Sequence, residues 1–225
     1  IYRAHCNTNT MTSTSQTPND DMETETTEIE RSDIAADGDL ILTVGGQLEL
    51  RVHSLLLKMN SPVFRKMLGS DWLEGQQLAN MSPATPGALD LPEDDGQGMK
   101  YLCLILHGQL DQLTASPTDM LMLSIAKTAD KYNCVSKTEL IFEAWFARKY
   151  ELGYGHVATA FVLDHTDHFA LLSRNLILHS ERQELMDLFA KGQTQDEYGI
   201  IAALETRYNL LYNTIIGGVK LIVDE

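Results

Sequence analysis

The fold of this chain can be predicted outward from one stretch, which reads Leu40-Ile41-Leu42-Thr43-Val44-Gly45-Gly46-Gln47-Leu48-Glu49-Leu50-Arg51-Val52. A run of β-favouring residues comes first, and residues 47–52 then alternate between apolar and polar. Between the two runs, Gly45 and Gly46 can adopt the positive φ angles that a two-residue hairpin turn requires. The stretch therefore predicts a β-hairpin.

After His53 the spacing of apolar residues changes from that of a strand to that of a helix. Leu55, Leu56 and Met59 form one apolar stripe, and Ser61-Pro62 has the N-cap and first-turn chemistry of a second helix. A short strand is expected at 88–91, followed by a helix that Gly108 ends. Further helices are expected at 136–150, 156–163, 167–179, 181–190 and 196–216. Gly217-Gly218 is expected to end the last of them, with 219–223 as a short strand or a frayed apolar tail. This order predicts an α+β fold with a helical C-terminal half.

The N-terminal residues have a different composition from the rest. Residues 1–37 carry eight acidic and two basic residues, which is −6 of the formal charge of −15 and leaves 24 acidic and 15 basic residues, or −9. Eight threonines lie between Thr8 and Thr27, without apolar periodicity. We expect residues 1–36 to be a disordered tail. No basic segment precedes an apolar block there, so we expect no signal peptide.

Composition also limits the classes of function. With 44% hydrophobic residues, the chain can bury a sizeable core. An acidic chain should be repelled by phosphate backbones and anionic lipids, so we expect no nucleic-acid or membrane partner. The three cysteines, Cys6, Cys103 and Cys134, form no C-x-x-C pair. They indicate a reducing intracellular compartment, which is the cytoplasm, the nucleus or both.

Several short strings together resemble the BTB/POZ domain family over residues 37–150. They are listed in chain order: Asp39-Leu40-Ile41-Leu42, Val52-His53-Ser54-Leu55-Leu56-Leu57, Ser61-Pro62-Val63-Phe64 with Met67, Leu89-Asp90-Leu91-Pro92-Glu93-Asp94-Asp95, and Ala129-Asp130-Lys131-Tyr132. Residues 151–225, with Ala160-Phe161-Val162-Leu163-Asp164 and Phe169, resemble the helical extension of fungal members. The resemblance implies a small sheet with a helical cluster, followed by an all-helical extension. His53 is interpreted as a residue of the fold, with its ring bonded to nearby backbone groups, rather than as a catalytic one.

The resemblance also implies a function. The family comprises protein-interaction modules that homodimerise or recruit other proteins, and catalyse nothing. Its adaptor branch docks on a cullin scaffold of ubiquitin ligases. In that branch Trp72, Glu74 and His107 occupy the partner-binding positions, although His107 replaces an aromatic residue and the loop after Trp72 is longer than usual. The alternative is a transcription-related dimerisation domain that recruits corepressors. Homodimerisation has two open routes, a swapped segment anchored by Ile29 and Ile34, or the first helices around 54–68.

Other chemistry has little support in the sequence. His165 and His168 are three residues apart and could share a metal on one helix face, but no cysteine or H-E-x-x-H pattern accompanies them. We interpret Asp164-His165-Thr166-Asp167-His168 as a capped turn between helices and predict no metal or other cofactor. Phosphate-binding loops and hydrolase motifs are absent from the sequence, so we do not expect an enzyme.

Overall fold

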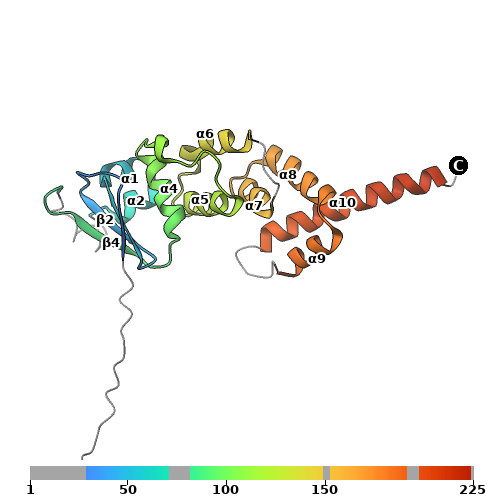
Figure 1. Cartoon of the computed structure of the whole chain (residues 1–225), viewed down its shortest axis with the longest axis horizontal. Helices are drawn as coiled ribbons and strands as arrows, with labels where there is room; N and C mark the ends of the chain where they lie inside the picture. Colours follow the sequence, from blue (N-terminus) through green and yellow to red (C-terminus); the bar gives the residue numbers. More distant parts are fainter. Residues whose placement is uncertain (1–28, 71–81, 149–152, 192–197, 224–225) are drawn as a thin grey trace, which may run out of the picture.

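A computed structural model describes residues 29–70, 82–148, 153–191 and 198–223 (Figure 1). Its four strands are β1 (Glu30–Asp33), β2 (Leu40–Val44), β3 (Leu48–Val52) and β4 (Gly87–Leu91). They form one small sheet in the order β1-β3-β2-β4. The described part of the chain is therefore an α+β protein, as the sequence predicts.

The predicted hairpin is present at the centre of the sheet. Strands β2 and β3 pair antiparallel, with Leu40 opposite Val52 and Val44 opposite Leu48. Gly45 and Gly46 make the turn with φ angles of +58° and +69°, which suit a residue without a side chain. The outer strands pair parallel to the hairpin, β1 with β3 and β4 with β2.

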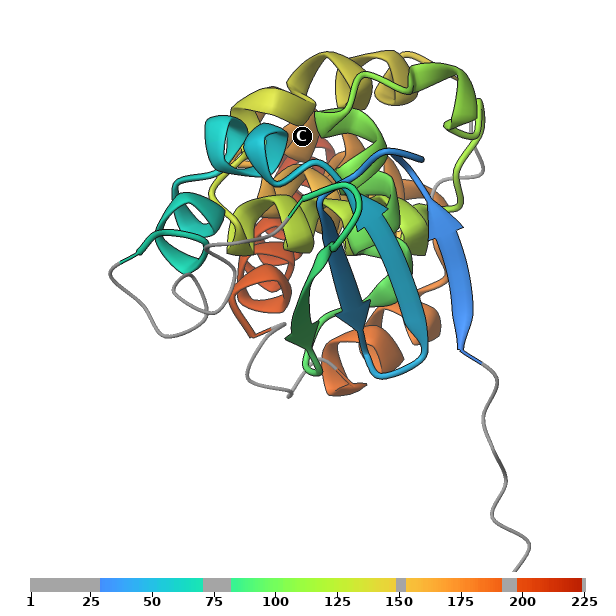
Figure 2. The same cartoon turned by 90° about the vertical axis from the view of Figure 1, so that its left-hand side faces the viewer.

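The first group of helices lies on one side of this sheet (Figure 2). Its elements are α1 (Ser54–Asn60), α2 (Pro62–Met67), α4 (Gly96–Leu106), the 3-10 turn η1 (Leu110–Gln112), α5 (Asp119–Lys131) and α6 (Val135–Phe146). Alternate residues of β2 and β3 point into this layer and are buried, so the sheet has one covered face. The core between the layers contains Leu42, Leu50, Phe64, Met99 and Tyr132.

Order begins earlier than the sequence predicted. The expectation that residues 1–36 are disordered is wrong for 30–36, because β1 pairs with β3 and Ala35 N–H donates to the carbonyl of Arg51. Ile34 is buried, at 3% exposure. Strand β1 is polar and is held by backbone hydrogen bonds, so its composition does not reveal it. Residues 1–28 lie outside the described residues.

The C-terminal half is helical, as predicted. It consists of α7 (Tyr154–Val162), α8 (Thr166–His179), α9 (Arg182–Lys191) and α10 (Tyr198–Val223). Helix α7 packs on α5 and connects this half to the first. The predicted domain boundary at residue 150 lies outside the described residues.

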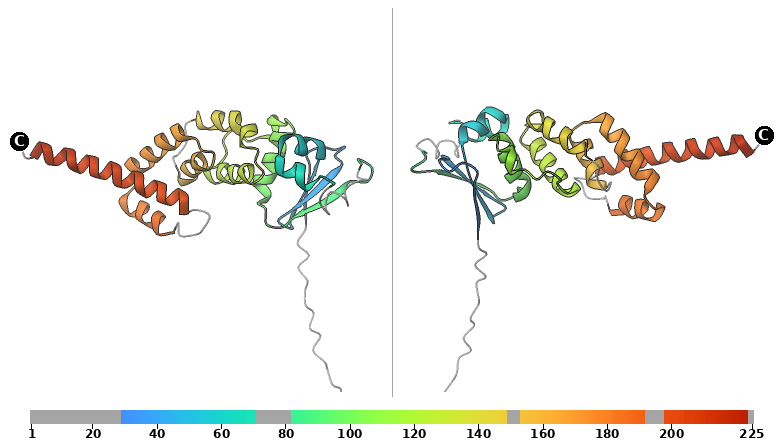
Figure 3. Two further views of the ribbon diagram at one scale, coloured as in Figure 1. Left: turned by 180° about the vertical axis from the view of Figure 1, so that it is seen from behind. Right: turned by 45° about the horizontal axis from the view of Figure 1, so that its top comes forward.

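Helix α10 extends further toward the C-terminus than the sequence predicted. It continues through Gly217-Gly218, which were expected to end it, and includes residues 219–223. Glycine lowers helix propensity by about 1 kcal/mol without forbidding a helix. Its C-terminal part extends away from the other helices (Figure 3). Within the described ranges, no helix is long and apolar enough to cross a membrane.

Candidate functional site

Of the three partner-binding residues predicted from the sequence, the structure describes only His107. Trp72 and Glu74 lie outside the described residues, so the cullin-docking role remains a prediction. His107 follows the last residue of α4 and lies beside His53, with ring centroids 5.9 Å apart. The structure therefore places this residue at the junction between the sheet and the first helix.

Both ring nitrogens of His107 are bonded within the chain. Nε2 accepts a hydrogen bond from the backbone N–H of His53 at 3.0 Å, so Nδ1 carries the proton and donates to the carbonyl of Cys103 at 2.7 Å. Burial lowers the pKa of His107, and His53 adds to this effect. A partner could form a hydrogen bond to this ring only by breaking one of these bonds. The geometry makes His107 a clamp between α4 and the start of α1.

The ring of His53 has a different partner from the one that the sequence predicted. Its ring was expected to bond nearby backbone groups, but its Nε2 lies 3.2 Å from Oδ1 of the Asp37 carboxylate. The first N–H of α1 is satisfied instead by Asp39, which accepts from Ser54 N and Oγ at 2.7 Å each. Burial alone would raise the pKa of Asp39, but these bonds outweigh burial and lower it. The start of α1 is thus fixed by polar contacts with three residues, His107, Asp37 and Asp39.

The outer face of α1 is the first candidate site for a partner. Leu55 and Met59 are 61% and 63% exposed, whereas Leu57 is fully buried. Residues four apart lie on the same side of a helix, so the two exposed side chains form one apolar patch, which we call the α1 patch. The sequence grouped these two residues with Leu56 in one apolar stripe; in the structure Leu56 is half-buried, and the fully buried leucine of this helix is Leu57. In a helix of only two turns, the sequence did not reveal which apolar side faces the core.

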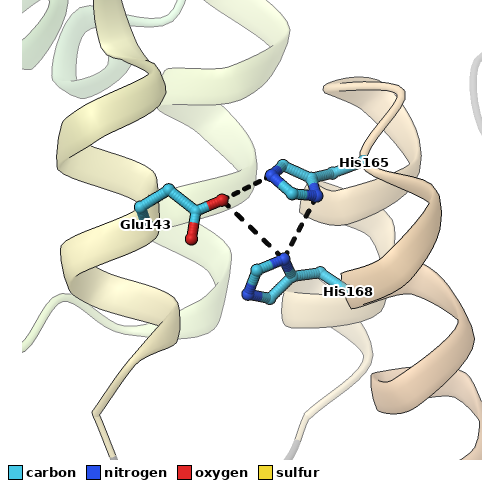
Figure 4. Close-up of side chains that lie close together, drawn as sticks. All are labelled: Glu143, His165 and His168. Atoms are coloured by element: carbon cyan, nitrogen blue, oxygen red, sulfur yellow. Dashed lines mark hydrogen bonds and ion pairs between the residues drawn. The ribbon is translucent and has the colours of Figure 1, made fainter.

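A second candidate site joins α6 to α8. The carboxylate of Glu143, on α6, lies 2.5 Å from Nε2 of His165 and 3.9 Å from Nδ1 of His168 (Figure 4). The Nδ1 atoms of the two histidines are 3.1 Å apart. All three side chains are half-buried, and their ligating atoms lie within 4.8 Å of one another. We call this group the Glu-His-His cluster.

Local backbone geometry explains how the two histidines come together. Helix α7 ends with Asp164 in the left-handed region at φ +55°, and His165 N–H then donates back to the carbonyl of Ala160 at 2.8 Å. This is the hydrogen-bond pattern of a helix C-cap, at which aspartate is one of the tolerated residues. His165 becomes the N-cap residue of α8, so the predicted turn between helices is present, but it is shorter than predicted because Thr166, Asp167 and His168 belong to the first turn of α8.

Sequence reasoning missed Glu143 as a member of this cluster. It is one of several acidic residues on the expected helix 136–150, and nothing in its spacing marks it as a neighbour of His165. The contact depends on how α6 and α8 lie in space (Figure 4). Only a tertiary structure could reveal it.

The described residues form an α+β protein with a small sheet, a helical layer and a helical C-terminal half, and both candidate sites lie on its helices. No protein-family model matches the chain, and no curated protein sequence matches it either.

Proposed function

We propose that this chain is a protein-interaction module of the BTB/POZ type that associates with a second copy of itself. Support for the family comes from two of the strings that suggested it. The string that begins at Ser61 and the one that ends at Tyr132 are in contact. Ser61 Oγ donates to the carbonyl of Tyr132 at 2.6 Å, and the Phe64 and Tyr132 rings stack with centroids 4.2 Å apart. The strings thus form one packing unit of the core.

The observation that carries the proposed function is the α1 patch. A large apolar side chain gains about 1.5–3 kcal/mol when it is fully buried, so leaving both Leu55 and Met59 in water forgoes a considerable stabilisation. Fixed polar contacts hold the start of α1, which limits the ordering cost of binding through this helix. A two-fold dimer buries the same patch on both copies, so each residue contributes twice.

The test compares the mass of the chain in solution with that of a variant whose patch is charged. Leu55→Glu/Met59→Glu should convert a dimer into a monomer in light scattering at tens of micromolar, because four carboxylates would have to be buried at the interface. Both side chains are exposed in the single chain, so the variant should fold normally by circular dichroism.

A matched control uses two other exposed leucines. Leu171 and Leu178, on α8, are 55% and 48% exposed, and Leu171→Glu/Leu178→Glu adds the same charge. This variant should remain dimeric. If the α8 variant dissociates and the α1 variant does not, the interface has been assigned to the wrong helix.

A further inference from the structure

The Glu-His-His cluster has the donor set of a metal site. A neutral imidazole nitrogen and a carboxylate oxygen are both ligands of Zn²⁺ and of neighbouring first-row divalent ions. Two imidazoles and one carboxylate from two different helices converge here (Figure 4). Among the described residues, no lysine or arginine lies within ion-pair distance of Glu143, so its carboxylate faces the two histidines alone.

The separations between the donor atoms suit a cation with small adjustments. Ligands at 2.0–2.2 Å from a tetrahedral Zn²⁺ are about 3.3–3.6 Å from one another. One oxygen of Glu143 lies 2.5 Å from Nε2 of His165 and 3.9 Å from Nδ1 of His168, which is on both sides of that range. With one donor atom taken from each residue, the three atoms lie within 4.8 Å of one another. The Glu143 side chain is 43% exposed, so rotation about its side-chain bonds can move the carboxylate by the fraction of an ångström that is needed.

The surroundings of the cluster orient its rings and favour positive charge. Phe146 stacks on His168, with centroids 4.5 Å apart, and meets His165 edge-on. This contact restricts both imidazoles before any ion binds, as neighbours of metal ligands commonly do. An adjoining open cleft of about 440 Å³ is lined by His165 and by three carboxylate residues, Glu139, Asp164 and Asp167. Carboxylates around a cleft raise the local concentration of cations.

We propose that Glu143, His165 and His168 bind one first-row divalent cation, with Zn²⁺ as the reference ion. The three protein ligands leave a fourth position for water, and solvent can reach the site because each of the three residues is partly exposed. The ion ties α6, in the first half of the chain, to α8, in the second. Binding to the folded chain alone therefore stabilises the contact between the two halves.

The test uses the full chain, free of any histidine tag and treated with chelator. Isothermal titration with Zn²⁺ should show one site per chain that His168→Ala and Glu143→Gln each weaken at least about tenfold. Co²⁺ should give the visible absorption of a nitrogen- and oxygen-ligated ion, and Mg²⁺ should not compete, because imidazole ligands do not suit it. Zn²⁺ should also raise the Tm of the wild type by several degrees, and less so in either variant.

His179→Ala is the matched control. His179 lies on the same helix, is exposed, and bonds only the carbonyl of Asn175 in the described chain. This variant removes one imidazole but leaves the cluster complete, so its Zn²⁺ affinity should equal that of the wild type. Glu143→Gln preserves side-chain shape and guards against loss of folding in His168→Ala. Absence of Zn²⁺ binding to the wild type at tens of micromolar, or equal affinity in all variants, overturns the proposal.

Discussion

The ring of Phe64 lies nearly parallel to the ring of Tyr132, with an angle of 13° between their planes. Phe64 belongs to α2, and Tyr132 follows the last residue of α5. Ser61 also links the two elements by hydrogen bonds. Its side chain caps α2 by accepting from Phe64 N–H, and its hydroxyl donates to the backbone carbonyl of Tyr132. Stability should therefore be sensitive to a small change at this buried junction.

Ser61→Ala should lower the free energy of unfolding by about 1–3 kcal/mol, because it removes a helix cap and leaves a buried carbonyl without its donor. Urea denaturation followed by circular dichroism measures the change. The exposed Ser136, on α6, supplies a matched control, and Ser136→Ala should alter stability by no more than about 0.5 kcal/mol. Equal effects from the two substitutions would refute the role assigned to Ser61.

The His107 clamp predicts a dependence of stability on pH. Burial lowers the pKa of this histidine below its ordinary value of about 6.5, so at intermediate pH the unfolded chain binds more protons than the folded one. The stability due to neutral His107 is complete above that ordinary value and is lost as the pH falls through the lowered one. Tm should decline as the pH falls from 7.5 to 5.5.

Two variants separate the charge of His107 from its hydrogen bonds. His107→Ala removes both bonds and should cost about 1–3 kcal/mol at pH 7.5. His107→Gln can keep an acceptor and a donor, so it should cost less. Both variants should show a shallower decline of Tm with falling pH, and the remaining slope reflects groups such as His156, whose pKa burial also lowers. If the decline of Tm with falling pH were unchanged in both variants, His107 would not be the source of the pH dependence.

The crossing of α5 and α7 leaves no room for a side chain at Gly155. A Cβ atom there would lie 2.6 Å from the backbone carbon and oxygen of Asp119. Gly155→Ala should cost at least about 1–3 kcal/mol because two helices must separate. Gly199→Ala is the control, since its Cβ would meet only Phe161 at an ordinary 3.6 Å, and its effect should stay within about 1 kcal/mol. Thermal melts of the two variants compare them directly, and similar Tm values would argue against the close crossing.

Salt should strengthen self-association through the α1 patch. Two copies that each carry a formal charge of −15 repel one another, and Lys58 and Arg65 add like charges beside the patch. Screening reduces both repulsions, whereas the apolar contact is unaffected or strengthened. The dimer dissociation constant measured by sedimentation should therefore decrease when the NaCl concentration is raised from 50 to 500 mM. This range includes 0.1 M, at which the Debye length is about 10 Å. A rise would point to an interface held by opposite charges.

The sequence predicted those parts of the fold that local chemistry determines. The alternation over 47–52 and the paired glycines predicted the hairpin, and apolar periodicity predicted the helices of the second half. Strand β1 could not be found in this way, because its pairing with β3 depends on backbone bonds between segments that are distant in sequence. The continuation of α10 through Gly217-Gly218 was missed because two glycines weaken a helix without ending it.

The candidate sites were less accessible than the fold. Spacing brought His165 and His168 together, but the third member, Glu143, reaches them only through the placement of α6 beside α8. Exposure of the α1 patch depends on the rotation of a two-turn helix about its axis. In so short a helix, the sequence does not distinguish an apolar residue that faces the core from one that faces solvent. His107 was selected by resemblance as a partner-binding residue, and its two internal hydrogen bonds depend on contacts that the sequence does not contain.

The most direct test of the proposed function is the mass of the wild-type chain in solution, measured by sedimentation equilibrium at tens of micromolar. Self-association through the α1 patch predicts twice the chain mass of 25.1 kDa, about 50 kDa, falling toward the monomer on dilution. A mass of 25.1 kDa at every concentration would contradict the account.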